Sequence, residues 1–162
     1  MMFKSTRFGA LLIVACSLLS TETGVAQKTD HYTPQSLMEQ SQPLIDKART
    51  TSGAAAITLE KYGVDFTMLS VRTKDGNAEV HEKFADIFVI VDGKATLLSG
   101  GEMQDAATTG PGELKGTGIA HGTTTELGKG DVIHIPPNTP HQLLIPKGTT
   151  LTYFVVKVKE VE

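Results

Sequence analysis

The sequence has one cysteine, Cys16, and no tryptophan among its 162 residues. Cys16 lies in an N-terminal segment that we expect to be removed. The mature chain is therefore expected to have no disulfide, no thiolate metal site and no cysteine nucleophile. An excess of basic residues is also missing, because the formal net charge is -3. This balance excludes the electrostatic footprint of a nucleic-acid-binding protein.

The first 26 residues have the pattern of a secretory signal. Lys4 and Arg7 precede an apolar run over residues 8–19, and small residues follow up to Ala26. The apolar run is too short for a comfortable membrane span. We therefore expect cleavage after Ala26 and export to the periplasm or the extracellular space.

A second processing route competes with this one. Residues 13–16 read IVAC, which resembles a bacterial lipobox in which Cys16 is lipidated and anchors the protein to a membrane. Leu18 and Leu19 continue the apolar run beyond Cys16, which argues against that route. Soluble export is the favoured prediction, and membrane attachment is expected only if Cys16 is lipidated.

The remaining length suits one domain. We expect a signal peptide over 1–26, an extension with a short helix over 27–55, and a β-barrel over 56–162. Thr33 is a good N-cap for the helix, and Pro34 fits the first helical position.

After residue 53 the pattern changes to short segments with a period of two and many β-branched residues. About ten such segments, separated by Gly, Asp and Asn turns, predict an all-β sandwich or barrel. The Gly-rich residues 100–112 are the best candidate for a long flexible loop.

Five histidines are the main candidates for chemistry. Without cysteine, a metal site would need histidine nitrogens and carboxylate oxygens. That mixture suits iron, manganese, zinc, nickel or copper.

Two stretches, HEKFADIFVIVDG and GKGDVIHIPPNTPH, resemble the two motifs of the cupin superfamily. The residues that fit are Asp86 and Gly93 in the first motif, and Gly130-Asp131, Ile135-Pro136 and His141 in the second. The resemblance implies a jelly-roll barrel of the double-stranded β-helix type. It further implies a metal and a small-molecule ligand inside the barrel, and a homodimer.

His141 is the strongest ligand candidate. Pro136 and Pro137 end one strand, and Pro140 keeps the residue before it extended. His141 then enters the next strand with its side chain expected in the interior, held by stiff backbone on both sides.

The first motif fits less well. Counting back from Asp86 places Val80 and Glu82 where the family has two histidines. Counting from His81 instead gives Lys83 as the second position. His81 and Glu82 cannot both point inward on a regular strand. The candidate ligands are therefore His81, His141, and Asp86 or Glu82; a cupin that has lost its metal is the alternative.

Two further residues are weaker candidates for the pocket. His134 shares the face of Val132, and Lys83 is a cation beside the first motif. His121 is expected to face solvent.

These features predict an exported cupin that binds a divalent metal and a small polar molecule in its barrel, and that works as a metal-dependent oxygenase or isomerase. The alternative is a non-catalytic barrel that binds a small ligand without metal. The fold alone does not choose between these reactions.

Overall fold

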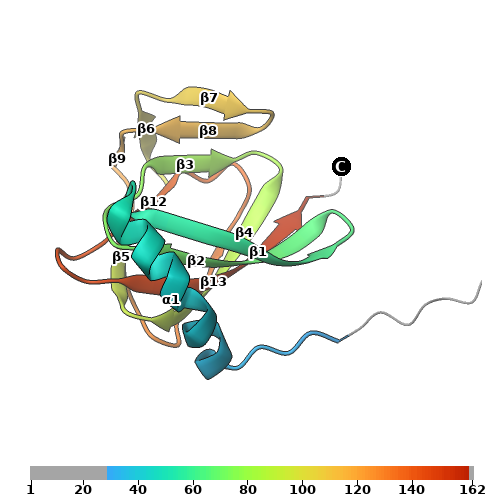
Figure 1. Ribbon diagram of the computed structural model, residues 1–162. Coiled ribbons are helices and arrows are strands. Elements are labelled where there is room, and N and C mark those ends of the chain that lie inside the picture. Colours follow the sequence, from blue (N-terminus) through green and yellow to red (C-terminus); the bar gives the residue numbers. More distant parts are fainter. Residues whose placement is uncertain (1–28, 161–162) are drawn as a thin grey trace, which may run out of the picture. The chain divides into compact units, whose positions relative to one another are not determined.

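The computed structural model describes residues 29–160 (Figure 1). The predicted signal peptide and Cys16 lie outside the described residues, so export and lipidation stay predictions. The described residues from Tyr32 onward belong to one compact unit. Among the described residues, no helix has both the length and the apolar character that crossing a bilayer requires.

The helix α1 (Pro34–Thr50) begins where the sequence predicts. The Thr33 side chain accepts a hydrogen bond from the Ser36 N–H at 3.0 Å, and the Ser36 hydroxyl accepts one from the Thr33 N–H at 3.0 Å. This reciprocal capping satisfies two N–H groups that the helix itself cannot bond. The helix continues through Pro43 and buries Leu37, Leu44 and Ile45.

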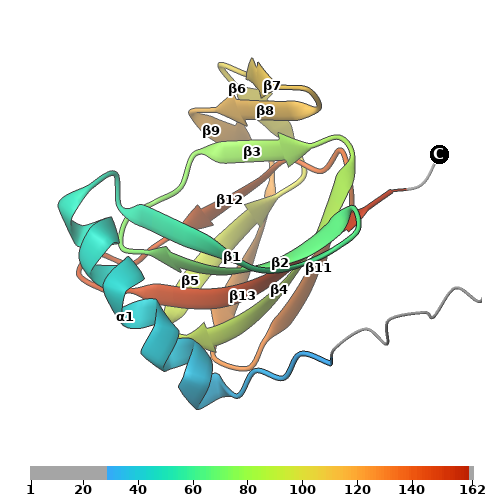
Figure 2. The same cartoon turned by 45° about the vertical axis from the view of Figure 1, so that its right-hand side comes forward.

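Two antiparallel sheets form the barrel (Figures 1 and 2), which confirms the all-β prediction. The five-stranded sheet has the order β1 (Ala54–Tyr62), β2 (Asp65–Arg72), β13 (Leu151–Lys159), β4 (Phe84–Asp92), β11 (Val132–Ile135). The six-stranded sheet has the order β10 (Thr123–Gly128), β5 (Lys94–Ser99), β12 (His141–Leu144), β3 (Ala78–His81), β8 (Glu113–Gly116), β7 (Ala107–Gly110). A two-stranded sheet pairs β6 (Glu102–Gln104) with β9 (Gly118–Ala120).

Apolar side chains fill the two layers that this arrangement creates. Between the sheets lie residues of both, including Phe88, Leu97, Leu143 and Tyr153. On its other side the five-stranded sheet packs Leu69 and neighbouring residues against α1. Successive side chains of a strand point to opposite faces of the sheet. The strands β2, β4 and β13 therefore contribute apolar side chains both to the core between the sheets and to the core beneath α1.

Gly93 turns the chain between β4 and β5 and has to be a glycine. Its φ is 91°, and an added Cβ would lie 2.0 Å from the Thr150 carbonyl oxygen. The position that resembles the glycine of the first cupin motif is thus explained by a close backbone approach.

The prediction of a long loop over residues 100–112 was wrong. This stretch contains β6 and β7, with turns at Gly100, Gly101 and Asp105, all of which have positive φ. The Thr117 hydroxyl donates to Asp105 at 2.7 Å and ties the turn to the chain beside β9. Glycine and threonine at high density indicated a loop, but here they form tight turns between very short strands.

Candidate metal centre

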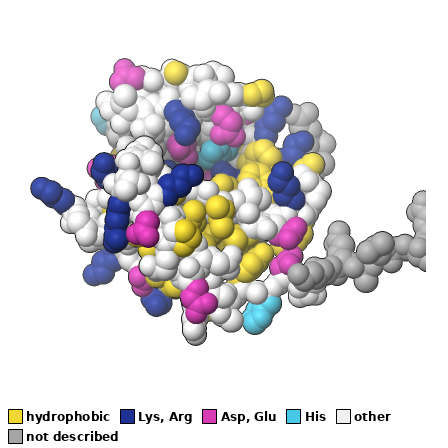
Figure 3. All heavy atoms as spheres, viewed as in Figure 1, with side chains coloured by type: hydrophobic (Ala, Val, Ile, Leu, Met, Phe, Trp, Pro, Cys, Tyr) yellow, Lys and Arg dark blue, Asp and Glu magenta, His cyan; other side chains and the backbone are white. Residues whose placement is uncertain are grey.

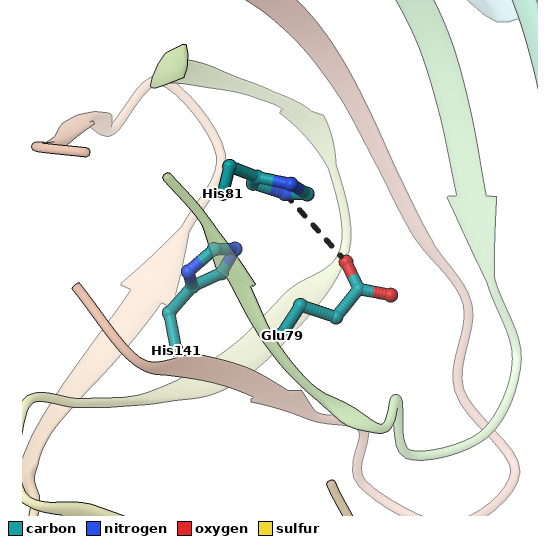
Figure 4. Close-up of side chains that lie close together, drawn as sticks. All are labelled: Glu79, His81 and His141. Atoms are coloured by element: carbon teal, nitrogen blue, oxygen red, sulfur yellow. Dashed lines mark ion pairs between the residues drawn. The ribbon is translucent and has the colours of Figure 1, made fainter. Parts of the chain in front are cut away.

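Three ligand-type side chains come together on the six-stranded sheet. Glu79 and His81 are two residues apart on β3, so they share a face. Glu79 stands directly opposite His141 of β12 in the antiparallel register. Figure 4 shows the three side chains pointing toward one another, and one donor atom from each lies within 4.8 Å of the others.

Asp86 joins this group from the five-stranded sheet. On β4, Asp86 shares the inward face with Phe88 and Ile90, and its side chain is only 3% exposed. The Asp86 Oδ2 atom lies 3.5 Å from His81 Nε2 and 3.7 Å from His141 Nε2. One carboxylate oxygen is therefore shared by the two imidazoles across the barrel interior.

Both histidines present the same nitrogen to the centre. His81 Nδ1 is 2.6 Å from Glu113 Oε2, and His141 Nδ1 is 3.0 Å from the Thr139 carbonyl oxygen. The Glu113 carboxylate oxygen and the Thr139 carbonyl oxygen act as acceptors here, so we assign the Nδ1–H tautomer to each ring. Each Nε2 lone pair then faces the cluster, as in metal-ligating histidines whose other nitrogen donates to a fixed acceptor.

The spacing of the donors fits a single transition-metal ion. Three donor–donor distances lie between 3.5 and 3.9 Å. They join His81 Nε2 to Glu79 Oε2, His81 Nε2 to Asp86 Oδ2, and His141 Nε2 to Asp86 Oδ2. Donors at tetrahedral corners about 2.1 Å from one ion are roughly 3.4 Å apart. These three distances exceed that value by up to about half an ångström, and the donor atoms of Glu79, His81 and His141 lie within 4.8 Å of one another, so the side chains would move inward to close around an ion.

The proline turn before His141 is fastened to β3. The Asn138 N–H donates to the His81 carbonyl at 2.9 Å, and Asn138 has a φ of 61°. Pro136 and Pro137 end β11 before this turn, as the sequence predicts. The turn therefore links the backbones that carry the two histidines, and it fixes one relative to the other.

Each acidic ligand uses its second oxygen on a cation of a neighbouring strand. Lys115 Nζ is 3.1 Å from Glu79 Oε1, and Lys157 Nζ is 2.5 Å from Asp86 Oδ1. Both pairs are direct cross-strand partners, Glu79 with Lys115 of β8 and Asp86 with Lys157 of β13. The Arg72 Nη2 atom also approaches Glu79 Oε1, at 3.9 Å.

A cleft of about 380 Å³ opens over the cluster. Its walls include Glu79, His81, Asp86 and Phe88, together with the three cationic side chains Arg72, Lys115 and Lys157. Figure 3 shows acidic, basic and histidine side chains gathered on this face, below the strands β7 and β8. A second cavity of about 370 Å³ lies beside α1 among mainly apolar side chains and contains none of the cluster.

The surroundings of the cluster shift the pKa values of two of its members, Glu79 and His141. Burial by itself raises the pKa of the Glu79 carboxyl, but Lys115 and Arg72 outweigh it and hold that pKa below its usual range. Burial lowers the pKa of His141, against the opposing effects of Thr139 and Asp86. Glu79 is thus anionic and His141 neutral at neutral pH, the protonation states that coordinate metals.

The structure brings together three of the residues that the sequence singles out: His81, Asp86 and His141. It places the other three outside the cleft. Glu82 and Lys83 are exposed in the turn between β3 and β4, so Glu82 does not supply the anionic ligand. His134 is exposed on the outer face of β11, because it alternates with the buried Ile135. His121 is exposed, as expected.

Sequence reasoning missed Glu79. If His81 is taken as the second ligand of the pair, the first falls two residues earlier, on Glu79, and Asp86 follows five residues after His81. Same-face spacing on a strand was the signal that could have found it. Glu113, Lys115 and Lys157 carried no such signal, since they reach the site only through strand pairing.

Comparison with known proteins supports the fold. No family model and no curated protein matches the chain. Among solved structures, a conserved protein with a double-stranded β-helix domain from Klebsiella pneumoniae is 13% identical. The match covers 67% of this chain and 74% of that one, with a TM-score of 0.50. The chain therefore has a double-stranded β-helix fold.

Two other solved structures match with lower TM-scores. A Cupin 2 conserved barrel domain protein from Salinispora arenicola is 17% identical over 64% of this chain and 74% of that one, with a TM-score of 0.44. The polyketide cyclase RemF from Streptomyces resistomycificus is 18% identical over 67% and 68%, with a TM-score of 0.48. At such identities the likeness concerns the fold and not the reaction.

Proposed function

We propose that this protein is a metal-dependent cupin enzyme that holds one divalent ion on Glu79, His81, Asp86 and His141 and acts on a small polar molecule in the cleft. The observation that carries the proposal is the paired orientation of the two imidazoles. Each gives its Nδ1–H to a fixed acceptor and leaves Nε2 facing the buried Asp86 oxygen. A purely structural histidine pair has no need for this matched arrangement.

The donor set narrows the ion by its chemistry. Two imidazoles with carboxylate oxygens and no sulfur suit iron, manganese or zinc, and two histidines with one carboxylate are the ligands of many non-haem iron enzymes. When bound, such an ion supplies Lewis-acid polarisation of a substrate oxygen or, for iron, dioxygen chemistry. An oxygenase or an isomerase is the reaction class that we propose.

The chain's own residues define what happens around the ion. Phe88 packs edge-on against His141, with ring centroids 6.3 Å apart, and closes the inner side of the site. Lys157 and Lys115 hold the two carboxylates through one oxygen each, so the other oxygen of each is directed at the histidines. Tyr153 accepts a hydrogen bond from Arg72 Nε at 3.3 Å and keeps that guanidinium in the cleft wall.

A barrel that binds a small ligand without metal is the second candidate. One observation favours it: the cations Arg72, Lys115 and Lys157 balance the anions Glu79, Asp86 and Glu113 when both histidines are neutral. Such a cluster is electrically satisfied without an ion.

Metal content separates the two candidates. We would reconstitute wild type, His81→Ala and His141→Ala with iron, manganese and zinc in turn, and measure retained metal by elemental mass spectrometry. His134→Ala is the matched control, because it removes an exposed histidine outside the cleft. The enzyme proposal expects near-stoichiometric metal in wild type and His134→Ala, and loss of it in the other two. Wild type without metal in all three reconstitutions would favour the metal-free barrel.

We also propose that the protein is exported, on the pattern of residues 1–26. Intact-mass measurement on protein recovered outside the cytoplasm should give a chain that begins at Gln27. A chain that begins at a lipidated Cys16 would support the membrane-anchored alternative. The homodimer stays a prediction from the family resemblance, to be tested by sedimentation.

A further inference from the structure

One carboxylate oxygen at the mouth of the cleft is shared by two cations. Lys115 Nζ lies 3.1 Å from Glu79 Oε1, and Arg72 Nη2 lies 3.9 Å from the same atom. The Asp86 carboxylate has its own partner in Lys157. Around Glu79, the two cations Arg72 and Lys115 therefore face a single carboxylate. Glu113 does not balance them there, because it contacts His81 instead.

The Arg72 guanidinium does not donate a hydrogen bond to Glu79. A distance of 3.9 Å is too long for a hydrogen bond, so the guanidinium attracts Glu79 without donating to it. The Arg72 Nε donates to the Tyr153 hydroxyl. The Arg72 Nη1 atom lies so close to Gly76 that a Cβ added to this glycine would be 2.6 Å from it. This fixed, largely buried fork is the kind of donor that recognises carboxylates through two parallel bonds.

A divalent ion would bring excess positive charge to the cleft. With both histidines neutral, as metal coordination requires, the cations Arg72, Lys115 and Lys157 balance the anions Glu79, Asp86 and Glu113, so the charge of the ion is left over in a partly buried cleft. Uncompensated charge is costly in such a place, and an anionic ligand removes the cost.

We infer that the cleft takes an organic anion, with a carboxylate of the ligand placed between Arg72 and Lys115 beside the metal. This inference rests on the proposed metal site and adds its substrate class. The Lys115 side chain is 47% exposed, which suits it to meet the anion first at the mouth. Arg72, at 16% exposed, would then fix the carboxylate deeper in the cleft. The cleft volume of about 380 Å³ admits a small organic acid.

The test compares a charged ligand with its neutral analogue. Metal-loaded protein, freed of excess metal by gel filtration, is titrated with succinate and with succinamide by calorimetry, and the metal content of the same sample is measured. We expect succinate to bind at least about tenfold more tightly than succinamide, since hydrogen bonds to charged groups are worth roughly 1.5–3 kcal/mol.

Three variants locate the binding. Lys115→Gln should weaken succinate binding about threefold or more, and Arg72→Lys, which keeps the charge but loses the fork, about tenfold. Lys147→Gln removes a cation from an exposed turn after β12 and should leave the affinity unchanged. Lys115 also holds the Glu79 carboxylate, so the metal content of each variant is measured in the titrated sample. Weaker succinate binding counts for the inference only where that metal content equals the wild-type value.

The outcomes keep the two proposals apart. The anion inference is overturned if succinate and succinamide bind equally or if neither binds. It is also overturned if both cleft variants bind succinate as wild type does. In each of these cases, metal retained by the protein still supports the metal site. Protein that retains no metal overturns both, and the elemental analysis reports that result independently of the titration.

Discussion

Glu113 and His81 are cross-strand partners on β8 and β3, and the Glu113 Oε2 atom lies 2.6 Å from His81 Nδ1. This carboxylate fixes which nitrogen of His81 carries the proton and makes the opposite nitrogen a better ligand. Glu113 is therefore a positioning residue of the proposed metal centre, although it lies outside the ring of donors.

Substitution of Glu113 should weaken metal binding without abolishing it. We expect Glu113→Gln to lower metal affinity about tenfold, because glutamine still accepts the Nδ1–H but carries no charge, and Glu113→Ala to lower it by up to about 100-fold. Competition against a chelator of known affinity measures the change. Glu126→Gln, on the exposed strand β10, is the control. An unchanged affinity in Glu113→Ala would remove Glu113 from the site.

Lys157 should stabilise the metal-free protein more than the metal-loaded one. Its partner Asp86 is buried, and removal of one member of a buried ion pair costs about 3–5 kcal/mol because the remaining charge is uncompensated. We expect Lys157→Met to lower the free energy of unfolding of the metal-free protein by about 3 kcal/mol, with a smaller loss after metal loading. Urea unfolding with and without metal measures both. Lys159→Met on the same strand, where the side chain is exposed, should have little effect. Equal losses in both states would show that metal does not compensate Asp86.

The stability of the metal-free protein should fall as the pH falls below neutrality. Burial holds the pKa of His141 below its usual 6.5, so below that pH the unfolded chain binds more protons than the native chain. The contribution is present above pH 6.5 and is lost as the pH falls toward the lowered pKa of the folded state. The lowered pKa of Glu79 adds a loss in the same direction at a pH below 4.5.

Urea unfolding at several values between about pH 7.5 and about pH 5.5 tests the first part, with an expected slope of up to about 1.4 kcal/mol per pH unit below pH 6.5. His141→Gln should flatten the slope in this window, whereas His134→Gln should not. A slope that survives in His141→Gln would assign the effect to another group.

Gly93 should tolerate a side chain much less well than Gly63. Both have positive φ, 91° and 68°, but an added Cβ at Gly63 meets nothing within 4 Å, whereas at Gly93 it meets the Thr150 carbonyl at 2.0 Å. Gly63→Ala should cost about 1–2 kcal/mol for its conformation alone. Gly93→Ala should cost clearly more, and equal losses in urea unfolding would contradict the close approach.

The barrel and three of the four proposed ligands could be predicted from the sequence, because they depend on local patterns. Period-two segments predict strands, and the prolines around residues 136–140 predict a stiff turn that delivers His141 to the interior. Asp86 follows from its spacing to Gly93 in the first motif, and His81 was a candidate although its spacing to Asp86 did not fit that motif.

The rest depends on which strand pairs with which, and in what register. Glu113 and Lys115 reach the centre because β8 lies beside β3, and a shift of one residue would turn both away. Glu82 was a candidate because counting back from Asp86 places it at a histidine position of the first motif, but it lies exposed in the turn at residues 82–83. Residues 100–112 show the same limit, since very short strands are defined by their partners more than by their own composition.

The most direct test of the metal centre is a crystal structure of the metal-loaded protein with anomalous diffraction collected at the absorption edge of the ion. We expect one strong anomalous peak about 2.1 Å from both His81 Nε2 and His141 Nε2, with oxygens of Glu79 and Asp86 completing the site. An anomalous peak elsewhere would contradict the proposed metal centre. So would electron density that shows no ion between the histidines, with the two carboxylates contacted only by Lys157 and Lys115.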